Sequence, residues 1–425
     1  MSPVENHARE FAAPEVTRTM IGRSLTVGLV FSAASIFLAL LPSTRGQFFH
    51  AYLLGFMMWL GVSLGSMAFL MIQHLTGGEW GMVIRRQLEA AMNVLPLVAV
   101  LFIPIAAAGM VHLYSGSHEN PGGWPGWLHY TGPDAHLEQM SHDYLRPWGT
   151  AGFLFLNGYI GRAIVYFAIW LVLASVLTRW SAEQDHPPLA NLSPRFRTLS
   201  APGLILYAFT ISFAVIDWVM SIDPHWYSTM FGFIFIAGQC LSAMCMMVII
   251  GRVLLPYEPT RSLLKPKEVH DHGKLMLTFV LLWAYFSFSQ LLIIWAGNLP
   301  MEIRFFTRRL NGGWEVLGLG LVIFHFAVPF LFLLSRPFKR NPRTLVWLAA
   351  WLFFMRFIDL FWYIEANFHR TLTFYAGYLI DLVVPIAIGG LWMAFFFRNL
   401  RSRPLVPVYD LHGQEFLEYA GVAHD

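Results

Sequence analysis

The stretch TMFGFIFIAGQCLSAMCMMVIIGRVL, residues 229–254, decides the class of fold. It has no Asp, Glu, Lys or Arg before Arg252. A helix of about 20 apolar residues crosses the roughly 30 Å hydrocarbon core of a membrane. The alternating pattern of a membrane β-barrel strand is absent from this stretch. The sequence therefore predicts a transmembrane helix here.

Runs of the same kind extend over most of the 425 residues, of which 56% are hydrophobic and 12% charged. A soluble domain has about twice that charged fraction. The expected fold is an all-α polytopic membrane protein of about ten transmembrane helices, within a membrane domain at 22–398. An N-terminal tail at 1–21, without a signal peptide, and a C-terminal tail at 399–425 are expected to flank it. The expected spans are 22–41, 47–73, 82–111, 151–178, 201–221, 229–254, 270–296, 314–335, 343–364 and 375–398.

The distribution of Lys and Arg predicts the orientation of these spans, because cytoplasmic loops carry an excess of basic residues. With an even number of spans, both termini lie on one side of the membrane. That side would hold 20 of the 28 Lys and Arg residues and the other side six, while Arg162 and Arg356 lie within spans. Both termini, and both tails, are therefore expected to be cytoplasmic.

The longest expected loop, at about 112–150, lies on the outer face and has five histidines. Their spacing matches no compact metal motif, so the loop is interpreted as an ordered cover of the helix ends or a contact for a partner. The histidines are His112, His118, His129, His136 and His142. The two cysteines, Cys240 and Cys245, form no CxxC pair and are interpreted as packing residues.

Two similar motifs stand 142 residues apart. Residues 215–229 read VIDWVMSIDPHWYST, and residues 357–371 read FIDLFWYIEANFHRT. Each has Ile-Asp, a second Ile followed by an acid six positions beyond that Asp, an aromatic residue three later, and a final Thr. The offset corresponds to four spans, so spans 2–5 and 6–9 are expected to be parallel repeats. The alternative is chance similarity between two interfacial segments.

Ionisable side chains within the expected spans are candidates for function, because a charge in the hydrocarbon core costs several kcal/mol. Ordered by depth, they form a discontinuous ladder from the inner to the outer face, as a proton relay needs. The alternative is that each polar side chain joins helices or lies near water. The candidates for a proton path are Glu89, His325, Asp217, Asp381, His270, Asp271 and His272. Arg356 and Asp359, one turn apart, are predicted to form a structural ion pair.

No redox cofactor is expected from the histidines. A transmembrane haem needs paired histidines that face one cavity. His325 alone is deeply central, since His50 and His74 lie near opposite ends of span 2. No metal site is predicted either.

Several loop motifs resemble those of one family of membrane subunits. The most specific is the connection after span 5, DWVMSIDPHWYST at 217–229. The segments HLTGGEWG at 74–81 and GNLP at 297–300 fit the same group. Over nearly its whole length, the chain resembles the NrfD/polysulfide-reductase-like membrane subunits of bacterial alternative complex III.

This resemblance implies a fold and a task. The fold is two four-helix bundles, spans 2–5 and 6–9, flanked by spans 1 and 10. Alternative complex III oxidises quinol and passes electrons to a periplasmic carrier. It has two subunits of this family: one is thought to hold the quinol site, and the other is implicated in proton passage. Short tails and the GNLP motif make the chain most similar to the latter. The implied location is the bacterial cytoplasmic (inner) membrane.

The resemblance also implies partners: an iron–sulfur subunit, multihaem cytochrome subunits, a second NrfD-like subunit and membrane lipid, but no nucleic acid. No cofactor is expected to bind directly, and menaquinone or another quinone is expected nearby. The expected function is that of a subunit of a quinol:electron-acceptor oxidoreductase, not catalytic alone. It would scaffold the complex and provide a proton-conducting path.

Two other functions remain open. In the first, the chain binds and oxidises quinol, with His325 or Asp217 accepting protons. In the second, it is a secondary transporter, since parallel repeats and polar residues at mid-depth also suit one. Broken helices at matching places in both halves would favour the transporter. No phosphate-binding loop supports ATP-driven transport.

Overall fold

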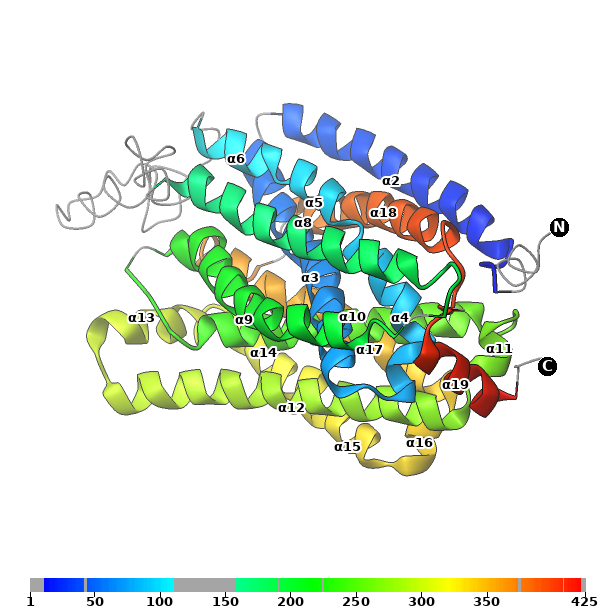
Figure 1. Ribbon diagram of the computed structural model, residues 1–425. Coiled ribbons are helices and arrows are strands. Elements are labelled where there is room, and N and C mark those ends of the chain that lie inside the picture. The colour runs from blue at the N-terminus through cyan, green and yellow to red at the C-terminus, as the bar shows by residue number, and fades with distance from the viewer. Residues whose placement is uncertain are drawn as a thin grey trace.

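The computed structural model describes residues 11–41, 44–110, 158–189, 191–223, 225–373, 376–407 and 409–421. Within these ranges, ten helices are long and apolar enough to cross a membrane, which confirms the expected all-α polytopic fold. Figure 1 shows these helices running side by side. The loop with five histidines lies outside the described residues.

The first five spans begin and end close to the expected positions. They are α2 (Val16–Leu40), α3 (Arg45–Thr76), the three segments α4 (Glu79–Met92), α5 (Leu95–Leu101) and α6 (Ile103–Met110), α8 (Tyr159–Glu183), and α9 (Ser193–Trp218). The second five are α10 (Phe231–Leu254), α12 (Pro266–Gly297), α14 (Trp314–Gly320) with η3 (Leu321–Ala327) and α15 (Val328–Leu334), α17 (Pro342–Glu365), and α18 (Ile380–Arg401).

Short helices lie between the spans and after the last one. They are η2 (Met220–Ile222), α11 (Thr260–Leu263), α13 (Pro300–Arg309), α16 (Arg336–Arg340), η4 (Ala376–Leu379) and α19 (Leu411–Ala420). We call one end of the molecule the terminal end, because α2 begins there and α18 finishes there. The other is the opposite end. Figure 1 shows α11, α16 and α19 at the terminal end and α13 at the opposite end.

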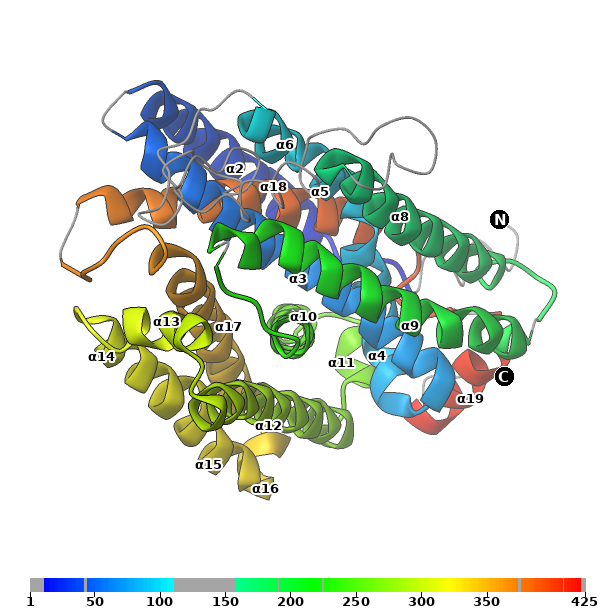
Figure 2. The ribbon, with the colours of Figure 1, turned by 90° about the vertical axis from the view of Figure 1, so that its left-hand side faces the viewer.

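The helices α3 and α10 form the centre of the molecule. The most apolar window of α3 is 94% buried and that of α10 is 78% buried. α3 packs against α9, α10 and α18, whereas α10 also packs against α12 and α17. A side chain at Gly65 of α3 would collide with the backbone of Gln239 on α10, so the small residue permits this close approach. Figure 2 shows α10 end-on, with α3 and α9 on one side of it and α12 and α17 on the other.

The first and last spans pack on each other. α2 contacts α18 along its length, and α18 in turn packs on α3. Gly28 of α2 and Gly390 of α18 meet, and a side chain at either position would collide with the backbone of the other helix. The two flanking helices therefore lie together beside the first bundle (Figure 1) rather than on opposite sides of the molecule.

The tails depart from the expected bounds. α2 begins at Val16 rather than near residue 22, because its polar first turn has partners: Arg401 of α18 donates to Thr17 at 3.2 Å and to Glu15 at 3.1 Å. The C-terminal tail contains α19, whose Phe416 belongs to an apolar cluster that includes Phe11 from the N-terminal tail. Parts of both tails are therefore packed against the terminal end.

Two spans are irregular. The third span is divided into α4, α5 and α6, with Pro96 and Pro104 near the divisions. The eighth span contains a π-helical turn, η3, and Pro329 follows it in α15. Proline has no N–H for the carbonyl four residues before it, here that of His325. The turn that holds His325 is thus the irregular part of this span.

Candidate functional site

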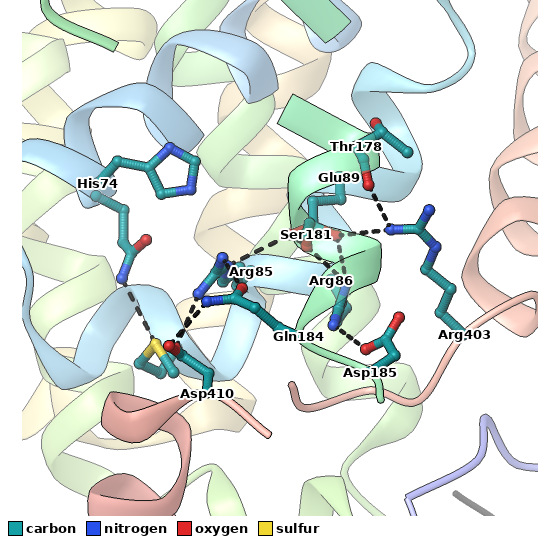
Figure 3. Close-up of polar contacts among 12 residues, drawn as sticks. His74, Arg85, Arg86, Glu89, Thr178, Ser181, Gln184, Asp185, Arg403 and Asp410 are labelled. Atoms are coloured by element: carbon teal, nitrogen blue, oxygen red, sulfur yellow. Dashed lines mark hydrogen bonds and ion pairs between the residues drawn. The ribbon is translucent and has the colours of Figure 1, made fainter. Parts of the chain in front are cut away.

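A buried polar cluster lies at the terminal end around Glu89 of α4. Arg86 donates to Glu89 Oε2 at 2.8 Å, and Arg85 donates to Oε1 at 3.4 Å. Ser181 of α8 donates its hydroxyl to the same Oε1 at 2.6 Å. Arg85, Arg86 and Glu89 are each 3% exposed. Glu89 is therefore held as a paired carboxylate, as Figure 3 shows.

The same arginines have further acidic partners. Arg85 contacts Asp410 Oδ2 at 3.3 Å, and Arg86 pairs with Asp185. Arg403 approaches Glu89 at 3.9 Å. Burial raises the pKa of Asp410, and the positive charge of Arg85 acts against that rise. With three arginines and three carboxylates, this set of side chains has no excess formal charge when all are ionised. We call it the terminal-end cluster.

A cavity of about 250 Å³ lies beside the terminal-end cluster. It is lined by His74, Arg85, Gln184 and Asp410, among others. Gln184 accepts from Arg85 at 2.6 Å and donates to Asp410 at 2.8 Å. The cavity thus gives space for water next to Arg85, which contacts Glu89.

The candidates His270, Asp271 and His272 lie near the start of α12, apart from Glu89. Asp271 pairs with the exposed Lys274 at 2.8 Å. His270 Nδ1 is 3.9 Å from Asp271. His272 is buried, and its Nε2 lies 2.9 Å from the carbonyl oxygen of Trp80. The His272 contact joins α12 to the start of α4, and no hydrogen bond between described residues links these three candidates to Glu89.

Asp217 lies near the end of α9 and is fully hydrogen-bonded. Arg162 of α8 donates from Nε to Oδ2 at 2.8 Å and from Nη2 to Oδ1 at 3.0 Å. Tyr166 donates its hydroxyl to Oδ2 at 2.9 Å. Such a two-point arginine–carboxylate contact is strong and directional. Asp217 thereby joins α8 to α9.

Asp359 of α17 is held less completely. Arg356, one turn earlier, donates to Oδ2, so the expected ion pair is present, and Trp283 of α12 donates to the same oxygen at 3.2 Å. Oδ1 has no hydrogen-bond partner within the described residues. His325 lies against Trp283 with ring centres 4.4 Å apart, and both of its ring nitrogens likewise have no partner there.

Another buried polar cluster lies at the opposite end, around Glu365, the last residue of α17. Gln47 of α3 donates from Nε2 to Glu365 Oε2 at 3.2 Å and to both oxygens of Asp381 at 2.9 Å. His50 and His369 approach Glu365 Oε2 at 3.7 and 3.4 Å. We call these five residues the opposite-end cluster.

Several members of these clusters were not predicted as site residues. Asp381 was expected, but Glu365 and His369 were not, although their spacing of four residues next to a helix end was visible in the second Ile-Asp motif. Gln47 and Gln184 carry no signal of their own, since amides are frequent in helix contacts. Their roles depend on contacts between distant segments.

Comparisons with known proteins found no family model that matches the chain and no curated protein that matches it.

Proposed function

We propose that this chain is a membrane subunit of a quinol-oxidising electron-transfer complex, which it scaffolds and to which it supplies a proton-conducting path. The loop motifs that resemble alternative complex III suggest the complex. Buried ionisable groups at three depths support the proton path: Glu89 at the terminal end, the His325–Asp359 region between, and Glu365 with Asp381 at the opposite end. Such groups are costly in a membrane, so their presence favours a function.

This proton path needs water between the clusters, because no single side chain moves a proton about 30 Å. The cavity beside Arg85 would admit water from the terminal end. Among the described residues, the nitrogens of His325 and Oδ1 of Asp359 have no hydrogen-bond partner, so they are suitable positions for water at mid-depth. Asp217, held by Arg162 and Tyr166, would have a mainly structural role. It is the least suited of the candidates to carry protons.

The sharpest test of the proton path is Glu89→Gln. Arg86 would keep Asp185 and Arg85 would keep Asp410, so assembly should survive the change. We expect quinol oxidation to continue and proton uptake from the terminal side to fall, as measured with a pH dye in vesicles that contain the whole complex. Glu183→Gln, at the exposed pair with Arg195, is the matched control and should change neither. Unchanged proton movement per electron in Glu89→Gln would exclude Glu89 from the path.

Quinol binding by this subunit is the second candidate. A cavity of about 660 Å³ between α12, α13, α14 and α17 supports it, since its lining is mostly apolar and includes Asp359, Arg309 and Gln290. Ligand sites typically have volumes of about 300–1,000 Å³ and a few polar groups that orient the ligand. A quinol could donate to Asp359 Oδ1, the unpartnered oxygen.

Filling the cavity would test this second candidate. Leu319→Trp adds bulk to its lining, and we expect quinol oxidation to fall while assembly is retained. Leu331→Trp is the matched control, because Leu331 is 66% exposed and is not part of the cavity lining. Equal quinol oxidation in both variants would mean that quinol does not use this cavity.

The transporter is less well supported. The break of the third span into α4, α5 and α6 has no counterpart in α12, which is continuous from Pro266 to Gly297. Spans 3 and 7 would correspond in the repeat, so matching broken helices are not found at this position in the described residues.

The proposed location is the bacterial inner membrane with the terminal end in the cytoplasm, in accord with the excess of Lys and Arg there. A cysteine introduced at Ser262, in α11, should then be inaccessible to an impermeant thiol reagent in intact cells. Labelling of that cysteine from outside would reverse the orientation.

A further inference from the structure

The opposite-end cluster contains three side chains that can bind a metal ion. His50 is on α3, Glu365 ends α17, and His369 follows four residues later. One donor atom of each lies within 4.8 Å of the others. His50 Nδ1 and His369 Nε2 approach the same oxygen, Glu365 Oε2, at 3.7 and 3.4 Å. Three donors from separate parts of the chain therefore converge.

These separations are close to those between ligands of one metal ion. Zinc bonds to nitrogen and oxygen are about 2.0–2.1 Å long, so neighbouring donors in a tetrahedron are about 3.3 Å apart. The His369–Glu365 distance already fits, and the His50–Glu365 distance exceeds that value by only a few tenths of an ångström. The His50 and His369 donors lie within 4.8 Å of each other, so side-chain rotations would also have to bring these two closer together.

His50 provides independent evidence for a ligand. It is 6% exposed, and within the described residues neither of its ring nitrogens has a hydrogen-bond partner. Its ring stacks on Phe368 with centres 3.5 Å apart, which fixes its plane. Glu365 Oε1 is buried and also without a partner. Buried polar atoms left unpaired are costly. Metal ligation would satisfy Nδ1 of His50, and it would also satisfy Oε1 of Glu365 if that carboxylate binds with both oxygens.

The charge of the cluster also favours a cation. Glu365 and Asp381 share the amide of Gln47. In the part of the chain that the structure describes, the hydrogen-bond and ion-pair partners of these two carboxylates are Gln47, His50 and His369. Two buried carboxylates repel each other strongly in a medium of low dielectric constant. One divalent cation would balance both charges.

The surroundings select the kind of cation. A cavity of about 300 Å³ next to His369 is also lined by Arg304, Arg308 and Arg370. Their positive charge disfavours loosely held cations, so an ion must bind through direct ligation. Calcium and magnesium prefer shells of six or more oxygen atoms. Two imidazoles and one carboxylate instead suit a transition metal.

We propose that His50, Glu365 and His369 bind one divalent transition-metal ion, for which Zn²⁺ is the best fit. Gln47 would support the site through its Nε2, which donates to Glu365 Oε2 at 3.2 Å. His369 Nε2 would exchange its present contact with Gln47 Oε1, at 3.0 Å, for the metal. The ion would fasten the end of α17, in the second bundle, to the start of α3, in the first. Glu365 also belongs to the proposed proton path, but zinc binding can be measured on the chain whether or not that path exists.

Zinc binding to the purified full-length chain tests the proposal. The detergent-solubilised protein is treated with a chelator and titrated with Zn²⁺ by calorimetry, and bound zinc is measured by mass spectrometry. We expect one tightly bound Zn²⁺ in the wild type and none in His50→Gln or His369→Gln. Gln47→Ala should bind Zn²⁺ about 10–100-fold more weakly, as is usual for loss of a residue that orients a ligand.

The control is His325→Gln, another buried histidine with unpartnered nitrogens, which lies in η3 outside the cluster. It should bind zinc as the wild type does. Added Zn²⁺ should raise the thermal unfolding midpoint of the wild type and of His325→Gln, but not that of His369→Gln. No zinc bound to the wild type, or wild-type binding in both His50→Gln and His369→Gln, would show the proposal to be wrong.

Discussion

The two Ile-Asp motifs differ in how completely the first carboxylate is held. Asp217 receives two hydrogen bonds from Arg162 and one from Tyr166. Within the described ranges, Asp359 receives hydrogen bonds on one oxygen only, and it lines the cavity of about 660 Å³. In the first bundle both carboxylate oxygens therefore accept hydrogen bonds, whereas in the second, despite the similar sequence, one described oxygen does not.

The position of the arginine explains this difference. Arg162 is on a neighbouring helix, so one edge of its guanidinium, with Nε and Nη2, can face both oxygens of Asp217. Arg356 is on the same helix as Asp359 and reaches it with one nitrogen. Gly238 of α10 makes room for Arg356, because a side chain there would collide with the guanidinium. An arginine on the same helix thus leaves one carboxylate oxygen available to water or a ligand.

The largest expected effect is that of Asp217→Asn. Removing one partner of a buried ion pair typically costs about 3–5 kcal/mol, and three hydrogen bonds to a charged carboxylate are weakened here. We expect a loss of free energy of unfolding in that range, measured by denaturation in detergent. The double variant Arg162→Met with Asp217→Leu should recover most of it. A smaller loss than in Asp359→Asn would reverse the comparison between the motifs.

Asp359→Asn should cost about 3 kcal/mol, at the lower end of the same range, because Oδ1 has no hydrogen bond to lose. We expect it to damage assembly more than activity, measured as the yield of intact complex and its turnover. Arg356→Met combined with Asp359→Leu should restore assembly. Normal assembly with lost turnover in the single variant would instead assign the carboxylate a functional role.

Tyr166→Phe should have an intermediate effect and make the first motif resemble the second. It removes one hydrogen bond to a charged acceptor, which contributes about 1.5–3 kcal/mol. The matched control is Tyr207→Phe, which removes a bond of equal length, 2.9 Å, to the neutral amide of Gln239. That change should cost about 0.5–1.5 kcal/mol in the same denaturation measurement. Equal losses would mean that the charge of Asp217 does not strengthen its hydrogen bond with Tyr166.

The smallest effect is expected for Asp223→Asn, at the second acid of the first motif. Arg308, whose side chain is 16% exposed, approaches Asp223 at 3.4 Å by a single nitrogen. Asparagine keeps an oxygen that can accept from the backbone N–H of His225. We expect a loss of about 1.5 kcal/mol, the lower end for a hydrogen bond to a charged group, because only one long contact is weakened. A loss as large as that of Asp217→Asn would show that the second acid is equally important for stability.

The ten spans could be predicted from sequence because a helix satisfies its own backbone hydrogen bonds within a membrane. The breaks in the third span could not. Pro96 and Pro104 lie near such breaks, whereas Pro202 lies inside α9 and Pro385 inside α18 without ending the helix. A proline therefore marks a possible break, and packing against neighbouring helices decides whether one forms.

The site residues were predictable only where their contacts are local. Arg356 and Asp359 are three residues apart, so the sequence alone indicates their pairing. Arg162 and Asp217 are separated by 55 residues, and Gln47 and Asp381 by 334. Which of many buried polar groups meet across such separations depends on the packing of helices, which hydropathy does not specify.

The pairing of α2 with α18 has a consequence for biosynthesis. The ribosome makes α2 first and α18 last among the spans, so Gly28 has no Gly390 to meet until nearly the whole chain is inserted. Only 11% of the apolar window of α2 is buried even in the finished molecule. During translation α2 can contact α3, but it lacks its main neighbour until α18 is inserted. Its docking on α18 would be a late step that distinguishes a completed chain from a truncated one.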